Sequence, residues 1–187
     1  MATDLNLSTQ SKTEKKKLSV KEIALFAMLG ALTFGAQVAM EPFPNIHLTG
    51  MFVILFTRLF RKKALIPLYL YVFLIGVRWG FGLSWIPYLY IWLFLWGGVM
   101  LVPRKWNKKI TLWLYCFIGA LFGLSFGTLY APVQAFLFGF GIKEMFLWIA
   151  SGFPWDVVHA VGNAVFCILV IPFSDILEKA LKRCNFS

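Results

Sequence analysis

The chain is poor in charged side chains, and above all in acidic ones. Only 14% of its 187 residues are charged, and eight of these are acidic against 18 basic. Soluble domains carry about a quarter charged residues, so this composition argues against a soluble globular domain. The sequence also lacks the pattern G-x-x-x-x-G-K-[ST], and therefore the P-loop expected of a subunit that hydrolyses nucleotides.

Cysteine and histidine are scarce as well. The chain has three cysteines and two histidines, and no pair of cysteines has the spacing of a disulfide framework or of a metal site. We therefore predict a chain with no disulfide, no metal centre and no cofactor.

Apolar side chains are abundant by contrast. Hydrophobic residues make up 60% of the chain and aromatic residues 18%, and the mean hydropathy is +0.76. Several apolar runs approach the length of about 20 residues that crosses a bilayer as a helix. The runs are Val20–Ala39, Leu48–Phe60, Ala64–Val77, Trp85–Val102, Ile110–Tyr130 and Trp155–Phe173. We predict an all-α membrane protein with six transmembrane helices, of which the second and third are short.

The basic residues fall between these runs in four clusters, and only Arg78 and Lys143 lie elsewhere. If both termini are cytoplasmic, sixteen of the eighteen cations lie on the cytoplasmic side, as the positive-inside rule requires. We therefore read the positive charge as a sign of topology and not of nucleic-acid binding. The predicted organisation is a disordered cytoplasmic tail (1–19), a six-helix transmembrane domain (20–174) and a cytoplasmic C-terminal tail (175–187).

This N-in, C-in topology places most of the remaining polar and aromatic residues on the outer face. The first predicted outer loop carries Glu41, Asn45 and His47. The second carries Arg78, Trp79 and Trp85 and leads to Tyr88. The third, residues 131–154, is too apolar for an ordinary loop, and we expect it to fold back into the membrane boundary.

The stretch "GFPWDVVHAVGN" combines three polar residues with an apolar helical pattern. A helix that opens at Pro154 places Asp156, His159 and Asn163 on one face, at positions i, i+3 and i+7. Polar groups are costly within a membrane span, so the pattern favours a stripe that faces a ligand. In the alternative interpretation, Asp156 caps the helix and His159 bonds to a neighbouring helix.

Small residues recur every four positions along two predicted helices. The first series comprises Ala27, Ala31, Gly35 and Ala39, and the second comprises Gly119, Gly123, Gly127 and Ala131. Such ridges allow helices to approach closely in lipid. Each ridge serves either packing within the chain or docking of a separate membrane subunit.

Taken together, these patterns resemble an S component, the substrate-binding membrane subunit of an energy-coupling factor vitamin transporter. The resemblance rests on the six predicted spans, the A-x-x-x-A of Ala27 and Ala31, "PNIHL", "GFGLSWIPYLYIW" and "GFPWDVVHAVGN". It implies a non-enzymatic capture subunit of an ABC-type importer in the bacterial plasma membrane. It also implies that Ala27, Ala31 and Gly35 contact a transmembrane coupling subunit, which two cytoplasmic ATPases drive.

The resemblance implies a vitamin or a vitamin precursor as the ligand, and the aromatic outer face favours pyridoxine or hydroxymethylpyrimidine. The expected stacking faces are Trp79, Trp85, Tyr88 and Trp155. The expected polar partners of the ligand are Asp156, Glu41, His159 and Asn163. A cobalamin-type S component is the alternative within the family.

Two other functions remain open. "GLSFG" has the form G-x-S-x-G, so Ser125 and His159 faintly resemble the catalytic pair of a rhomboid intramembrane protease. The nucleophile elbow, however, needs a strand–turn–helix context, whereas Ser125 lies within a helical run. The second alternative is a membrane scaffold without a ligand.

Overall fold

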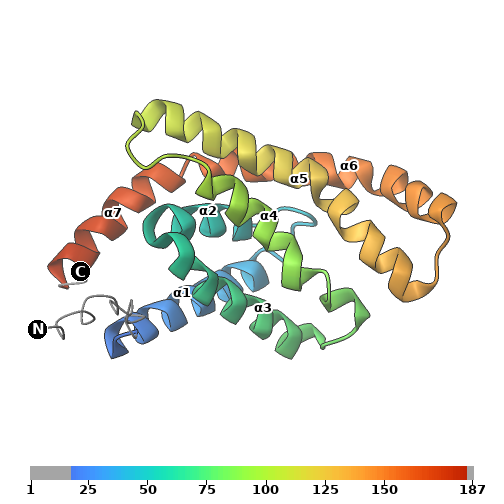
Figure 1. The fold of residues 1–187 in the computed structure, drawn as a ribbon, viewed down its shortest axis with the longest axis horizontal. Coiled ribbons are helices and arrows are strands. Elements are labelled where there is room, and N and C mark those ends of the chain that lie inside the picture. The colour runs from blue at the N-terminus through green and yellow to red at the C-terminus, as the bar shows by residue number, and fades with distance from the viewer. Residues whose placement is uncertain (1–17, 185–187) are drawn as a thin grey trace, which may run out of the picture.

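The computed structural model describes residues 18–184, and every regular element in that range is helical (Figure 1). The predicted all-α class is therefore confirmed for these residues. Most of the predicted N-terminal tail lies outside them. The α-helices are α1 (Val20–Ala39), α2 (Thr49–Phe60), α3 (Leu65–Trp79), α4 (Tyr88–Met100), α5 (Lys108–Phe138), α6 (Ile142–Cys167) and α7 (Val170–Arg183). Two short 3₁₀ turns are η1 (Arg61–Ala64) and η2 (Leu83–Trp85).

The first four α-helices follow the first four apolar runs closely. α1 covers the same residues as the first run, and it begins with a capping box. Ser19 Oγ accepts from the Glu22 N–H at 3.2 Å, and the Glu22 carboxylate accepts from the Ser19 N–H at 2.9 Å. This reciprocal pair satisfies two backbone donors at the helix start.

The last third of the chain differs from the sequence prediction. We expected an irregular loop from Ala131 to Pro154 and a helix that opens at Pro154. Instead α5 continues to Phe138, α6 begins at Ile142, and Pro154 lies inside α6. A short turn that begins at Gly139, in the left-handed region with φ 70°, joins the two helices. Membrane helices tolerate an internal proline because neighbouring groups can satisfy the freed carbonyl.

The sixth apolar run is also divided. α6 and α7 meet within it at an angle of 46°. Ser174 of α7 is buried, and its hydroxyl accepts from Nε of Arg58 in α2 at 3.0 Å. Residues 175–183, which the sequence assigned to a cytoplasmic tail, therefore continue α7 as it packs against α2.

Several helices are long and apolar enough to cross a membrane. α1, α5 and the segment Leu83–Met100, which contains α4, qualify alone, and α6 with α7 qualifies as a bent pair. α2 and α3 have 12 and 15 residues. At 1.5 Å per residue they extend about 18 and 23 Å, less than the ~30 Å of a hydrocarbon core. The chain thus has the helices of a membrane protein, while six spans with both termini inside stay a prediction.

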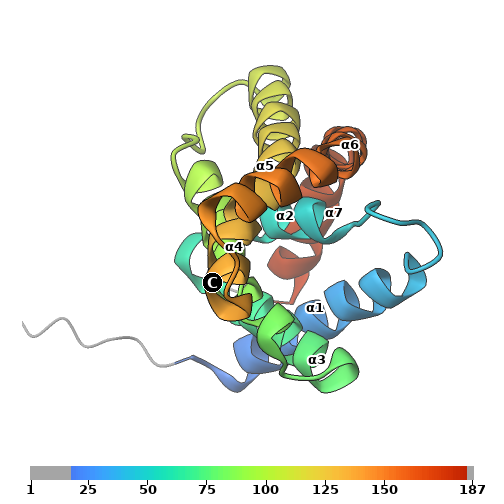
Figure 2. The same cartoon turned by 90° about the vertical axis from the view of Figure 1, so that its right-hand side faces the viewer.

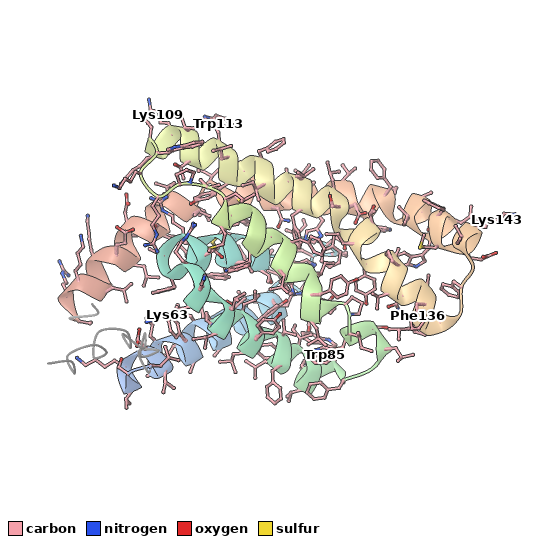
Figure 3. The ribbon with its side chains drawn as sticks, viewed as in Figure 1. Lys63, Trp85, Lys109, Trp113, Phe136 and Lys143 are labelled. Carbon is pink, nitrogen blue, oxygen red and sulfur yellow. The ribbon has the colours of Figure 1, made fainter. Side chains whose placement is uncertain are left out.

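The surface and the centre of the fold support the same class. Large apolar side chains such as Trp113 and Phe136, which are 75% and 85% exposed, project outward (Figure 3). Soluble monomers rarely expose extensive apolar surface of this kind. The centre is α2, in which every residue from Thr49 to Thr57 is buried among the surrounding helices (Figure 2).

The two ends of the molecule carry different side chains. Lys63 and Lys109 lie toward the end where α1 begins and α7 ends (Figures 1 and 3). Trp85, Phe136 and Lys143 lie toward the opposite end (Figure 3). Two of the predicted basic clusters are therefore separated along the long axis from residues of the second and third predicted outer loops.

The small-residue ridge of α5 packs against α6 within the chain. A Cβ added at Gly123 would lie 2.5 Å from Ala160 Cα, and one at Gly127 would lie 2.5 Å from an Asp156 carboxylate oxygen. The two helices run side by side along most of their length (Figures 1 and 2). This ridge therefore serves internal packing, the first of its two interpretations.

Replacing Gly123 with alanine tests this packing. The new methyl group would meet backbone atoms of α6, which can yield only if the helices separate. We expect Gly123→Ala to destabilise the protein by ~1–3 kcal/mol, the usual cost of overpacking. Gly35→Ala is the matched control, because a Cβ there has no neighbour within 4 Å. Equal melting temperatures for both variants in detergent would contradict the close contact.

Candidate binding site

A cavity of about 470 Å³ lies at the end of the molecule that carries Trp85 (Figure 3). Its lining comes from α1, the α1–α2 connection, α3, the α3–α4 connection, α4, α5 and α6. Segments from both halves of the chain therefore meet around one space. Its volume falls in the range of about 300–1,000 Å³ that is usual for small-molecule sites.

Seven of the sixteen residues that line the cavity are Phe, Trp or Tyr. The Trp92 ring lies 5.9 Å from Tyr71 and 6.4 Å from Tyr88, measured between ring centroids. The Phe126 ring is stacked on Tyr130 at 6.0 Å. Aromatic walls of this kind bind flat apolar surfaces and stack on ring systems.

Two hydrogen bonds to main-chain carbonyls hold the α3–α4 connection over the cavity. Trp85 Nε1 donates to the carbonyl of Val72 in α3 at 2.9 Å. The Tyr130 hydroxyl of α5 donates to the carbonyl of Ser84. The rim of the cavity is therefore fastened to helices on both sides.

A chain of hydrogen bonds, which we call the relay, joins Thr49, Gln37 of α1 and His47 at the cavity. The Thr49 hydroxyl donates to Gln37 Oε1 at 3.0 Å, so the other end of the amide, Nε2, faces Nδ1 of His47 at 3.2 Å. An amide nitrogen only donates, so Nδ1 accepts and a neutral His47 carries its proton on Nε2. The connection reaches this position through Asn45, whose φ of 59° is one that asparagine tolerates better than most residues.

His159 is the most unusual polar group in the cavity. It is only 4% exposed, it lines the cavity, and neither ring nitrogen has a hydrogen-bond partner among the described residues. Its ring lies 5.5 Å from His47 and 4.9 Å from Phe126, between centroids. The ring nitrogens are not among the fully buried polar atoms of the described residues, so they remain accessible from the cavity and can pair with a bound molecule.

The structure brings together just over half of the predicted site residues. Six of the eleven line the cavity: Asn45, His47, Trp79, Trp85, Tyr88 and His159. They come from three separate stretches of the sequence: 45–47, 79–88 and 159. Residues far apart in the sequence therefore meet around this cavity.

Asp156 and Asn163, in contrast, lie in the contact between α5 and α6. Both carboxylate oxygens of Asp156 accept from the Gly127 N–H, at 3.1 and 3.2 Å. Asn163 Nδ2 donates to the Gly119 carbonyl at 3.2 Å. Of the predicted polar stripe, only His159 lines the cavity, and its two companions join the helices that hold it.

The other three predicted residues lie at the surface, outside the cavity lining. Trp155 is 55% exposed, and Glu41 and Arg78 are exposed as well. The Arg78 guanidinium lies 5.3 Å from the centre of the Trp79 ring, so it touches a rim residue without entering the lining.

The cavity also has lining residues that the sequence patterns do not single out, chiefly Gln37, Tyr71, Ser84, Trp92, Phe126 and Tyr130. Gln37 carried a usable signal, because it is the single amide in an otherwise apolar run. The aromatic residues carried none, since α3, α4 and α5 are rich in aromatic side chains on every face.

Ser125 lies apart from this site. Its hydroxyl donates to the Leu121 carbonyl of its own helix at 2.8 Å, and it is not part of the cavity lining. The described geometry therefore does not pair Ser125 with His159.

Comparison of the chain with protein-family models, with curated proteins and with solved structures gives no match in any of the three.

The relay to His47 predicts a pH dependence of stability. Burial lowers the pKa of His47 from its ordinary value of 6.5, so the folded protein takes up this proton at lower pH than the unfolded chain does. The contribution of neutral His47 to the free energy of unfolding is fully present above about pH 6.5 and is lost as the pH falls below that value. We expect the melting temperature to fall on acidification through this window, and His47→Gln to reduce that fall. An identical pH profile for His47→Gln would contradict the assignment.

Proposed function

We propose that this chain is the substrate-capture subunit of a vitamin importer, similar to the S components of energy-coupling factor transporters. The observation that carries the proposal is the cavity of about 470 Å³, with aromatic walls and a few polar groups at its base. Such a cavity suits a small heteroaromatic molecule, with pyridoxine or hydroxymethylpyrimidine favoured. A coupling subunit and two ATPases would drive delivery of the ligand across the bacterial plasma membrane.

The size and lining of the cavity support a small ligand over a large one. A cobalamin, with its corrin ring and appended nucleotide, is too bulky for a space of this volume. Phe126, whose ring lies 4.9 Å from that of His159, places an aromatic face and a polar ring side by side in the lining. Burying nearly every ligand atom in such a cavity is what high affinity for a small molecule requires.

The small-residue ridge of α1 supports the proposed partner. Ala27, Ala31 and Gly35 are all exposed, in contrast to the glycines of α5. Met28 and Leu32 beside them are 70% and 54% exposed. A flat apolar surface with small residues at its centre permits close approach of another membrane helix. We assign it to docking of the coupling subunit.

Ligand titration tests the proposed function directly. Detergent-purified protein would be titrated with pyridoxine, hydroxymethylpyrimidine, thiamine and cobalamin while tryptophan fluorescence is followed. Nanomolar binding, about −12 kcal/mol, is expected for one of the small ligands. The fluorescence change should shrink in Trp79→Phe, since Trp79 lines the cavity, and persist in Trp113→Phe, since Trp113 is 75% exposed elsewhere.

Two results would count against this proposal. Tight binding of cobalamin alone would remove the small-ligand assignment. No binding of any of the four by protein shown to be folded would leave the importer proposal without its ligand class.

Bulk on the α1 ridge should separate ligand binding from transport. Ala31→Leu adds volume to an exposed position outside the cavity lining, so ligand affinity should remain within about twofold of wild type. Uptake by cells that contain the coupling subunit and ATPases should be abolished. Val161→Leu, at a 59% exposed position of α6, is the control and should leave both intact. Unimpaired uptake by Ala31→Leu would argue against docking at this ridge.

A further inference from the structure

We infer that the cavity takes its ligand in an uncharged form, rejects the phosphorylated form of the same molecule, and uses His159 as a hydrogen-bond partner for it. This inference rests on the proposed function and specifies the substrate class of that same site. Three observations support it: the charges of the lining, the state of its polar groups, and the burial of His159.

The lining contains no charged partner for an ionic ligand. None of its sixteen residues is Asp, Glu, Lys or Arg. The carboxylate of Asp156 is occupied by the Gly127 N–H, and the guanidinium of Arg78 lies over Trp79 outside the lining. An ion buried without a counter-charge loses its hydration with little in return. A phosphate monoester, with close to two negative charges at neutral pH, would be strongly disfavoured.

The polar groups of the cavity are neutral, and some of them lack protein partners. His47 Nδ1 is occupied by Gln37, which leaves Nε2–H of the neutral ring available as a donor. His159 makes no hydrogen bond within the described residues. A neutral imidazole has one donor and one acceptor nitrogen, so His159 can pair with a hydroxyl group or a ring nitrogen. Together the two rings match an uncharged heteroaromatic molecule that carries hydroxyl substituents.

The burial of His159 distinguishes a ligand-binding role from a structural one. A structural histidine forms hydrogen bonds within the protein, and its removal destabilises the fold. His159 is 96% buried as a residue, but its ring nitrogens are accessible and form no hydrogen bond among the described residues, so they join no other segment to α6. Its position within α6 is instead secured by its neighbours Asp156 and Ala160, through their contacts with α5.

The first experiment compares each neutral ligand with its own phosphate monoester. Affinities of the detergent-solubilised full chain for pyridoxine and for pyridoxine 5′-phosphate would be measured by calorimetry, as would those for hydroxymethylpyrimidine and its monophosphate. In whichever pair binds, we expect the affinity for the neutral molecule to be at least about a hundredfold higher than that for its phosphate. Equal affinities, or tighter binding of the phosphate, would overturn the inference and leave the proposed function standing. No binding of any of the four by folded protein would remove both.

A charge substitution separates electrostatic rejection from a simple lack of space. Ser84 is an exposed residue of the cavity rim, so Ser84→Lys places a cation beside the ligand. The preference for the neutral ligand should fall by about tenfold or more. Ser151→Lys, on the exposed surface of α6 and outside the lining, is the matched control. An unchanged ratio in Ser84→Lys would mean that size excludes the phosphate, which would overturn the charge argument.

Substitution of His159 tests its role. His159→Phe keeps a ring of similar shape and removes both nitrogens, so the melting temperature of the empty protein should be unchanged or raised. Affinity for the neutral ligand should fall about ten- to a hundredfold. His159→Gln, which retains a donor and an acceptor, should recover part of that loss. Destabilisation of the empty protein by His159→Phe, or unaltered affinity, would overturn the assignment.

Discussion

The close contact of α5 with α6 is the constraint on which the cavity depends. Gly119, Gly123 and Gly127 add no side chain of their own to this contact, and at Gly123 the backbone of α6 at Ala160 reaches α5 directly. The polar groups of Asp156 and Asn163 then bond to the backbone of α5. With these contacts in place, the intervening turn of α6 carries His159 to the cavity. The stripe that the sequence revealed thus combines one residue that faces the cavity with two that hold the helices together.

None of the residues that line the cavity carries a formal charge. Lys63 and Lys109 lie toward one end of the molecule, and the cavity opens near the other, where its lining is uncharged (Figure 3). Between them α2 is buried along nine consecutive residues, and apolar side chains cover the outside. The neutral polar groups of the lining therefore have no charged lining residue beside them. The uncharged lining is the physical basis that we propose for selection by ligand charge.

Local patterns predicted more of the fold than of the site. The apolar runs predicted the ends of α1 to α4 within about three residues. An apolar segment that satisfies its own backbone hydrogen bonds as a helix can be recognised from local sequence alone. The prediction failed around Pro154, because a proline that usually starts a helix can also lie inside one when its surroundings are apolar. Helical spacing correctly grouped Asp156, His159 and Asn163 on one face. It could not say which neighbour that face meets, because α5, α1 and the α1–α2 connection approach it only in three dimensions.

The length of the α5–α6 hairpin has a mechanical consequence. α5 has 31 residues and α6 has 26, or about 46 and 39 Å at 1.5 Å per residue, whereas a hydrocarbon core is ~30 Å thick. Helices that exceed the bilayer tilt to match it, so a thinner or thicker bilayer acts first on the inclination of this hairpin. The same hairpin carries Phe126, Tyr130 and His159. A change in the inclination of this hairpin in a bilayer would therefore move three residues of the cavity lining together, without any lipid entering the cavity.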